Sequence, residues 1–324
     1  MALRKFSAVM LVSMFALLFI LAGCGSDNGE GSAEEKDNGS KKENSYTVEH
    51  AMGETTVKGS PEKVVILTNE GTEAILSMGV KPVGAVKSWT GEPWYDHITD
   101  QMEGVEVVGT ESDINLEAIA ALQPDLIIGN KMRQEKHYEA LSKIAPTVFS
   151  ETLRGDWQIN FKLYAKALNI EEKGQEVLGN YENRVKEISE KLGDKKELEI
   201  SMVRFMAQDV RIYHKDSFSG IILEQLGFNR PEGQDVDDFA EKGVTKERIP
   251  EMNGDVIFYF TYETGDGEGN KVQDEWTKDP LWKNLEAVKA GKAYEVSDTI
   301  WNTAGGVIAA NKMLDDIEKF FLEK

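Results

Sequence analysis

The order of apolar and polar residues predicts matching α/β segments in two halves of the chain. NLEAIAALQPDLIIG (115–129) and TKERIPEMNGDVIFY (245–259) each begin with a polar residue that favours a helix start. Each continues with a short helix and then turns, at Pro124 or at Gly254. Each ends in an aspartate followed by a continuous apolar run, which is typical of a buried strand.

A second pair of segments extends this duplication. VVILTNEGTEAILSMGVKPVG (64–84) and VRIYHKDSFSGIILEQLGFNRP (210–231) both predict a strand, a loop, a helix and a glycine at the helix end. Matched units in two halves predict an α/β fold with two similar lobes. We place the lobes at residues 46–155 and 194–324.

Residues 156–193 separate the two lobes and carry little glycine or proline. Their apolar residues recur at intervals of three and four, which predicts a helix over 157–168 and a long helix over 171–192. A helix of that length spans roughly 30 Å, about the width of a domain. As the one connection between lobes it would be stiff, whereas the alternative is a long helix packed within one domain.

The N-terminus predicts export. Two basic residues, Arg4 and Lys5, precede an apolar run over 8–22, which has the proportions of a secretory leader and is short for a membrane span. The run leads into L-A-G-C, which resembles a bacterial lipoprotein signal cut before Cys24, the chain's one cysteine. A thiol at a new N-terminus can carry a diacylglyceryl group, and two or more acyl chains anchor a protein firmly. The alternative is a chance cysteine in a leader or a buried free thiol.

We therefore expect residues 1–23 to be a lipoprotein signal peptide. Residues 24–45 are polar, rich in Gly and Ser and without apolar periodicity, so they predict a flexible tether.

The net charge of the chain disfavours some classes of partner. The whole chain carries −20, and loss of Arg4 and Lys5 leaves 35 basic against 57 acidic side chains, a net −22. Such a surface disfavours nucleic acid and anionic lipid as partners. No further apolar segment is long enough to cross a membrane, so we expect contact with the membrane through the lipid anchor alone.

Four segments carry a resemblance to a known family. They are PEKVVILTNEGTEAILSMGVKPVG, NLEAIAALQPDLIIGNKMRQEKHYEALSKIAPTVF, DPLWKNLEAVKAGKAYEV and TIWNTAGG. Together with leader, tether and lobes, they resemble the solute-binding lipoproteins of ABC importers, in the class that carries ferric siderophores, haem or vitamin B12. Within it they look most like the Gram-positive subgroup for hydroxamate or citrate-based iron siderophores.

The resemblance implies capture of a ferric siderophore on the extracytoplasmic face of a Gram-positive cell membrane, by a monomer that is not an enzyme. The resemblance also implies that the ligand lies in a cleft between the lobes, at the C-terminal ends of strands, where open α/β sheets generally bind. Because siderophore oxygens already surround the iron, we expect no cofactor and no metal ligand from the protein. In family members for citrate-type ligands a basic residue often precedes the NLE segment. Here Glu111, Ser112 and Asp113 stand there, which favours a hydroxamate or mixed citrate–hydroxamate ligand.

Cationic and aromatic side chains that follow predicted strands are the candidate ligand contacts. Arg133 matches a family position that contacts siderophore oxygens, and Arg204 is a guanidinium inside an otherwise apolar strand, where it needs a partner. The full set of candidates is Lys87, Trp89, Trp94, Lys131, Arg133, Arg204, Tyr213, His214, Trp301 and Asn302. Each has an alternative role, as a packing residue, a solvated charge or the partner of a buried acid.

Glu117 and Glu247 occupy equivalent positions in the two repeats. They match family positions where one acid per lobe docks on arginines of the permease, so we expect an ABC permease dimer with its ATPase as partner. Twofold placement suits such a partner. Alternatively, each is only an acid in a first helical turn, favourable to the helix dipole.

Three other functions stay open. A haem carrier would use Tyr95, His97 or His214 as axial ligand. A carrier of free transition metal needs clustered histidines and carboxylates, but the four histidines lie in different segments. A secreted hydrolase is the third, although the chain lacks G-x-S-x-G, H-E-x-x-H and P-loop motifs.

Overall fold

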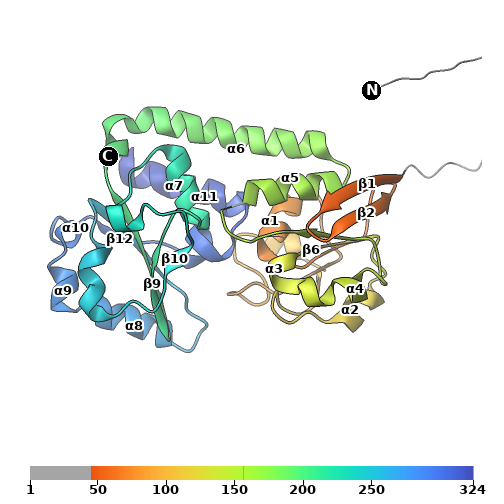
Figure 1. Cartoon of the computed structure of the whole chain (residues 1–324), viewed down its shortest axis with the longest axis horizontal. Helices are drawn as coiled ribbons and strands as arrows, with labels where there is room; N and C mark the ends of the chain where they lie inside the picture. Colours follow the sequence, from red (N-terminus) through yellow and green to blue (C-terminus); the bar gives the residue numbers. More distant parts are fainter. Residues whose placement is uncertain (1–44, 156, 324) are drawn as a thin grey trace, which may run out of the picture. The chain divides into compact units, whose positions relative to one another are not determined.

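Two five-stranded sheets organise the computed structural model, which describes residues 45–155 and 157–323 (Figure 1). The first sheet has the strand order β5-β4-β3-β6-β7 and is entirely parallel. The second has the order β10-β9-β8-β11-β12, in which β9 runs antiparallel to β8. The predicted mixed α/β architecture is confirmed. The predicted signal peptide, Cys24 and all but the last residue of the predicted tether lie outside the described residues.

The first lobe starts with a two-stranded hairpin, and parallel strands then alternate with helices. Its elements are β1 (Ser45–His50), β2 (Gly53–Lys58), β3 (Val64–Ile66), α1 (Asn69–Ser77), β4 (Gly84–Ala85), η1 (Thr99–Met102), β5 (Glu106–Val107), α2 (Leu116–Ala121), β6 (Leu126–Asn130), α3 (Lys131–Gln134), η2 (Glu135–His137), α4 (Tyr138–Leu141) and β7 (Thr147–Ser150).

The second lobe follows the linking helices. Its elements are η3 (Gly193–Glu197), β8 (Ile200–Met206), β9 (Asp209–Tyr213), α7 (Phe218–Leu226), η4 (Glu232–Gln234), β10 (Ala240–Glu241), η5 (Lys246–Met252), β11 (Val256–Thr261), α8 (Glu268–Thr277), α9 (Pro280–Lys283), α10 (Glu286–Lys289), β12 (Ala293–Glu295), η6 (Thr299–Thr303) and α11 (Val307–Phe321).

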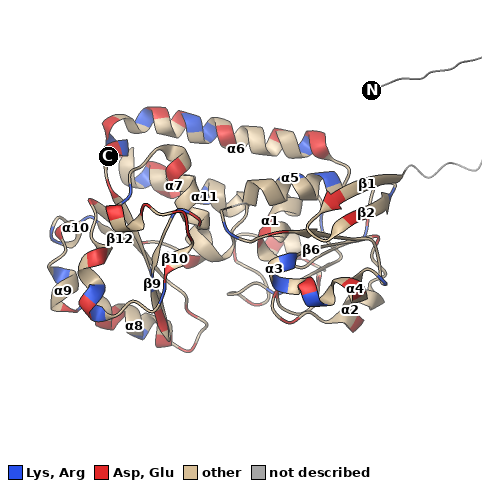
Figure 2. Ribbon diagram, viewed as in Figure 1, with Lys and Arg blue, Asp and Glu red and all other residues tan. Residues whose placement is uncertain are grey.

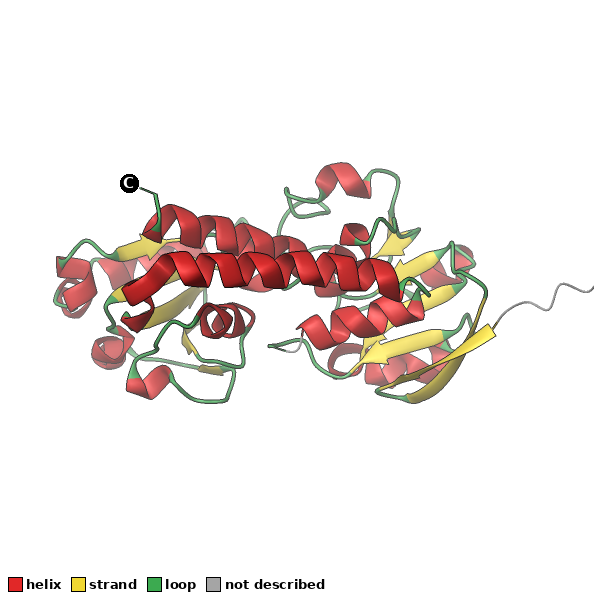
Figure 3. Ribbon diagram, turned by 90° about the horizontal axis from the view of Figure 1, so that it is seen from above, coloured by secondary structure: helices red, strands yellow, loops and turns green. Residues whose placement is uncertain are grey.

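The linking helices are α5 (Trp157–Ala167) and α6 (Glu171–Leu192), close to the ranges that their periodicity predicts. Seen from above, α6 lies along both lobes (Figure 3). Its buried residues recur every three or four positions, and its outer face carries charges of both signs (Figure 2). That pattern explains why a helix of 22 residues is stable here: one stripe packs and the rest is solvated.

Side chains of each central strand alternate between two apolar layers, as a pleated strand requires. In β8, for example, Ile200 and Met202 enter one layer while Val203 and Phe205 enter the other. The layer that contains Ile200 also holds buried apolar residues from β3, α1, α5, α6 and α11, so it is continuous across both lobes. The lobes are therefore joined by packing as well as by the chain, which the sequence analysis did not foresee.

The duplication is confirmed in detail for the segments that end in DLII and DVIF. Oδ2 of Asp125 accepts hydrogen bonds from the backbone N–H groups of Glu62 and Lys63, and Oδ2 of Asp255 accepts one from Glu199. Each aspartate thus fixes the start of the neighbouring parallel strand.

The upstream pair matches less closely. The helices α1 and α7 share a cap, because Thr68 and Ser217 each accept from the N–H of a glycine three residues on. The strands before them differ, since β3 is central and parallel whereas β9 is the antiparallel partner of β8.

Among the described residues, no helix has both the length and the apolar character of a membrane span.

Candidate functional site

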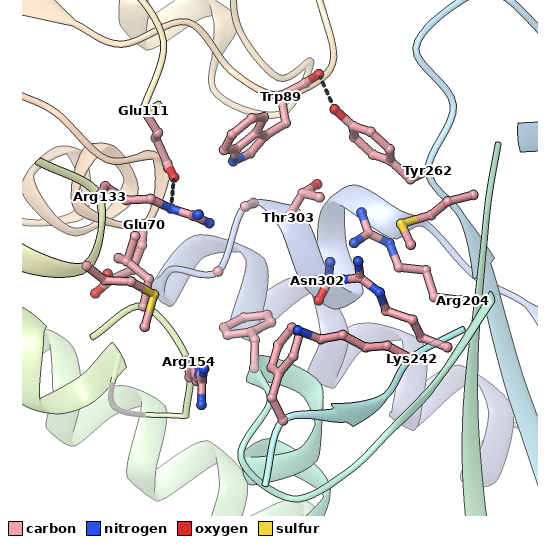
Figure 4. A pocket seen from close by; sticks show the side chains of 18 residues that line it. Glu70, Trp89, Glu111, Arg133, Arg154, Arg204, Lys242, Tyr262, Asn302 and Thr303 are labelled. Atoms are coloured by element: carbon pink, nitrogen blue, oxygen red, sulfur yellow. Dashed lines mark hydrogen bonds and ion pairs between the residues drawn. The ribbon is translucent and has the colours of Figure 1, made fainter. Parts of the chain in front are cut away.

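A pocket of about 550 Å³ lies between the two lobes (Figure 4). Its walls come from segments that follow β3, β4, β5, β6 and β7 in the first lobe. In the second lobe they come from β8 and β9 and from segments next to β9, β10, β11 and β12. These are mainly the C-terminal ends of parallel strands, where open α/β sheets bind ligands. The volume suits a compact small molecule.

The alternation of side chains along β8 and β11 determines which of their residues reach the second-lobe wall of the pocket. Positions 200, 202, 204 and 206 of β8 point to the same face of the sheet, and the first two are core residues. Toward the end of the strand this face leaves the core and meets the pocket, where Arg204 and Met206 line the wall. On β11 the same alternation runs from Phe258 to Phe260 and continues to Tyr262, the first residue after the strand. Tyr262 also lines the pocket.

Arg204 is held in place on three sides and is only 7% exposed. Its Nε donates to Oδ1 of Asp298 at 2.6 Å, and its Nη2 donates to Oδ2 of the same carboxylate at 3.1 Å. Its Nη1 donates to the hydroxyl of Tyr213 at 3.2 Å, and its Cζ lies 4.9 Å from the ring centre of Tyr262. A guanidinium has five N–H groups, so two remain for a ligand oxygen.

The first-lobe wall presents a second arginine on an aromatic ring. The Cζ of Arg133 lies 5.7 Å from the ring centre of Trp89, and its Nε lies 3.4 Å from Oε2 of Glu111. The other oxygen of Glu111 accepts from the backbone and side-chain nitrogens of Asn69 at 2.7 and 2.9 Å. The hydroxyl of Tyr262 donates to the backbone oxygen of Trp89 at 3.4 Å, so the two walls touch at this edge.

The pocket wall also contains two buried acids, Glu70 and Glu111, beside its basic side chains. Burial raises the pKa of Glu70 well above its ordinary range, and Glu111 and Glu73 raise it further against hydrogen bonds from Asn160 and Tyr164. Burial also raises the pKa of Glu111, against hydrogen bonds from Asn69 and the charge of Arg133. Both carboxyls therefore bind a proton more readily than exposed ones.

Of the ten candidate contacts, Arg204, Arg133, Trp89 and Asn302 line this pocket. Two others are ion-paired elsewhere: the Nζ of Lys87 lies 2.9 Å from Glu92, and that of Lys131 lies 2.8 Å from Glu151. Neither lysine belongs to the pocket wall.

The structure places the remaining four in the interior. Tyr213 lies behind Arg204, to which it is joined by the hydrogen bond described above, and its ring packs against that of Phe239. His214 is buried and pairs with Asp238. Trp94 and Trp301 belong to the apolar core, where the indole of Trp301 donates to Asp316 at 2.8 Å. The apolar surfaces of Trp94 and Trp301 are buried by packing in the core. Residue type does not show whether an aromatic side chain lies in the core or in a pocket, so it could not separate the two roles.

Arg211 is a pocket residue that the sequence analysis missed, although the sequence contained a signal for it. The strands β8 and β9 form a tight hairpin, with Met206 opposite Asp209 and Arg204 opposite Arg211. Directly paired residues share a face of the sheet, so both guanidiniums reach the pocket. VRFMAQDVRIY, considered as one hairpin, would have predicted this pair.

Some of the other missed residues come from loops, where periodicity gives no guidance. Arg154 follows β7 and donates to Asp216 of the other lobe at 3.3 Å. The remaining pocket residues that the sequence analysis did not select are Glu70, Glu111, Met132, Leu153, Met206, Phe218, Phe239, Lys242, Tyr262, Thr303, Ala304 and Gly305.

The alternative ligands have no matching residues on the pocket wall. Tyr95 donates its hydroxyl to the backbone oxygen of Thr303, His97 pairs with Glu73, and His214 pairs with Asp238, so none of the haem-ligand candidates lines the pocket. Within residues 45–155 and 157–323, no three His, Cys, Asp or Glu side chains form a group that could hold a metal ion.

The paired acids Glu117 and Glu247 have nearly identical surroundings. Both are exposed in the first turn of a short helix, α2 or η5, and residues 114–120 share their burial pattern with 244–250 position by position. A hydrogen bond from Thr245 lowers the pKa of Glu247 and keeps it ionised. Docking on a permease stays a prediction.

The chain was compared with known proteins. The family described as "Periplasmic binding protein" matches residues 64–299. The probable siderophore-binding lipoprotein YfiY of Bacillus subtilis (strain 168) is 49% identical over 329 residues, with 99% of each chain covered. The Fe(3+)-citrate-binding protein YfmC of the same organism is 30% identical, with 98% of this chain and 97% of the relative covered.

Among solved structures, Staphylococcus aureus SirA complexed with staphyloferrin B superimposes with a TM-score of 0.79. It is 37% identical, and the match covers 85% of this chain and 98% of SirA.

Proposed function

Because this chain belongs to the family of periplasmic binding proteins, we propose that it captures a ferric siderophore outside the cytoplasm and delivers it to an ABC importer. The observation that carries the proposal is the pocket between the lobes. Five basic side chains line it together with Trp89, Phe239 and Tyr262. Such a wall suits a compact complex with oxygen atoms and negative charge at its surface.

The pocket chemistry fits a metal that arrives already chelated. The siderophore supplies the iron's ligands, so the protein needs donors for the outer oxygens and apolar surface for the backbone of the chelator. Arg204 and Arg133 supply donors, while Trp89 and Tyr262 supply flat faces. Selectivity then depends on the arrangement of ligand oxygens, without a resident cofactor.

The names of similar proteins support this class of ligand. YfiY is named as a probable siderophore-binding lipoprotein, and the SirA structure contains staphyloferrin B. For this chain we favour a ferric siderophore of hydroxamate or mixed citrate–hydroxamate type. The basic pocket supports the mixed type most, since citrate adds carboxylate oxygens.

The cellular setting follows from the same proposal. The protein is anchored through a lipid on Cys24 to the extracytoplasmic face of a Gram-positive membrane and acts as a monomeric binder, with no enzymatic step. Its loaded form docks on a permease dimer, whose ATPase drives transport. Glu117 and Glu247 are the contacts we propose for that docking.

Tryptophan fluorescence tests the ligand class directly. The protein is titrated with ferric schizokinen, ferrichrome, ferric citrate and a ferric catecholate, with haem and Zn²⁺ as rival ligands. We expect saturable quenching by at least one ferric siderophore, and a smaller signal in Trp89→Phe, because Trp89 lines the pocket. Tight binding of haem or Zn²⁺ with no response to any siderophore would overturn the proposal. Steady turnover of ester or glycoside substrates would favour the hydrolase alternative.

A further inference from the structure

Most of the positive charge in the pocket is already paired. Four of its five basic side chains have an acidic partner within 4.0 Å. The pairs and their separations are Arg133–Glu111 (3.4 Å), Arg154–Asp216 (3.3 Å), Arg204–Asp298 (2.6 Å) and Arg211–Asp209 (2.6 Å). A paired guanidinium offers directed N–H groups, but the acid cancels much of its charge.

Lys242 is the exception. Among the residues that the structure describes, no carboxylate lies within ion-pair distance of its ammonium group. The side chain is exposed, and Figure 4 shows it extended into the pocket, on the side of Asn302 and Arg154. Its positive charge is therefore uncancelled at the place where a ligand would lie.

The ring of Phe239 adds a second observation. The Nζ of Lys242 lies 5.6 Å from the centre of this ring, and the Cζ of Arg154, from the other lobe, lies 5.5 Å from the same point. Each contact is a favourable cation–π interaction. The two cations nevertheless repel each other, and an anion between them would relieve that repulsion.

The backbone around Lys242 is fixed, whereas its ammonium group contacts a ring and has no ion pair among the described residues. Lys242 directly follows the edge strand β10, and the next residue, Gly243, donates its N–H to Oδ1 of Asp209 at 2.7 Å. Val244 then donates to the backbone oxygen of Val210 at 3.0 Å. Asp209 also holds Arg211, so one carboxylate positions both the lysine turn and a neighbouring guanidinium.

We propose that Lys242 contacts a carboxylate oxygen of the bound ligand and gives the pocket its preference for anionic, citrate-bearing ferric siderophores over uncharged trihydroxamate complexes. The inference rests on the proposed function and assigns charge selection within it to one side chain. The arginines supply hydrogen-bond geometry, and Lys242 supplies the net attraction. An ammonium suits this task because it is a compact charge on a flexible stem.

The test compares Lys242→Met with the control Lys319→Met. Lys319 also contacts an aromatic ring, that of Phe320, but it lies outside the pocket. Dissociation constants are measured for ferric schizokinen, which is anionic, and for ferrichrome, which is uncharged. We expect Lys242→Met to weaken ferric schizokinen binding by about tenfold or more at low salt and by less at high salt. Lys319→Met should stay within about twofold, as should ferrichrome binding by either variant.

Lys242→Arg tests charge separately from shape and should keep most of the affinity. The inference is overturned if Lys242→Met binds ferric schizokinen within about twofold of the parent, or if Lys242→Arg is as weak as Lys242→Met. Equal losses for schizokinen and ferrichrome would also overturn it, because they indicate a packing role. If the parent protein binds no ferric siderophore at all, the proposed function itself fails, which is a different result.

Discussion

Oε2 of Glu73 accepts a hydrogen bond from the backbone N–H of Ala309 at 2.8 Å, across 236 residues of sequence. Glu73 lies on α1 of the first lobe, whereas Ala309 lies in the first turn of α11, which has no side-chain cap of its own. A Cβ at Gly306 would lie 2.6 Å from the Cβ of Glu73, so a glycine there permits the approach. The other carboxylate oxygen pairs with His97. One lobe thus caps a helix that packs in the other.

Glu73→Ala should destabilise the protein by about 1–2 kcal/mol, because it removes a helix cap and its charge from the N-terminus of α11. Urea unfolding checks the change. Glu117→Ala is the control, since it removes an acid from the first turn of α2 without a contact between lobes. Equal stability of the two variants would show that the cap does not hold the lobes together.

Arg204→Ala should weaken ferric-siderophore binding by about 2 kcal/mol or more, because the ligand oxygens lose directed donors. Arg204→Lys should also bind poorly, since an ammonium cannot reproduce the fork that holds Asp298 and Tyr213. Both variants must first be shown to fold, because Asp298 is left with less compensation. Arg184→Ala is the matched control: it breaks ion pairs with Asp315 and Glu318 away from the pocket. Affinities equal to that control would remove Arg204 from the binding site.

Binding of an anionic siderophore should weaken as the pH rises. The ordinary pKa of a glutamate is near 4.5, and burial raises that of Glu70 well above it. Below the folded-state pKa the carboxyl is neutral; as the pH rises through that value, a negative charge forms beside the ligand. Stability changes with the same sign, because the folded state holds this proton more tightly than the unfolded state.

Glu70→Gln mimics the neutral form and should flatten this dependence. Dissociation constants for ferric schizokinen between about pH 5 and pH 9 check it. Glu139→Gln, the same change on the exposed face of α4, should keep the slope of the parent protein. A parent protein with no slope, or an unchanged slope in Glu70→Gln, would mean that Glu70 does not titrate next to the ligand.

Glu117→Ala combined with Glu247→Ala should abolish uptake of the iron–siderophore complex in cells and leave its affinity for the purified protein unchanged. Both acids are exposed, and neither lines the pocket. Uptake of ⁵⁵Fe-labelled siderophore gives the measurement, with Glu139→Ala as an exposed control. Persistent uptake in the double variant would leave the paired acids as helix-start residues only.

Periodicity and repeats were enough to predict much of the fold. Continuous apolar runs after an aspartate identified the strands of the DLII and DVIF segments, and intervals of three and four placed α5 and α6. The antiparallel hairpin of β8 and β9 was missed, because the two strands of VRFMAQDVRIY were considered separately and not as one hairpin. The continuous core across both lobes was missed for a similar reason, since packing of α11 on α1 joins residues far apart in the sequence.

The site was less predictable than the fold. Arg204 could be selected because a charge within an apolar strand needs a partner, and it lines the pocket. Trp301 was also selected by its residue type and its place after a strand. Its indole, however, donates a hydrogen bond to Asp316 inside the core. Lys242 and Arg154 lie in loops, and only the convergence of distant segments brings them to one cavity. Residue type predicts what a side chain can do, while topology decides where it does so.

The structure of the loaded protein tests the central claim most directly. A crystal structure with ferric schizokinen should show the complex in the pocket between the lobes, with guanidinium groups of Arg133 and Arg204 within hydrogen-bond distance of its oxygens. Its iron should have no ligand from the protein. A complex bound elsewhere, or one that touches neither arginine, would contradict the account.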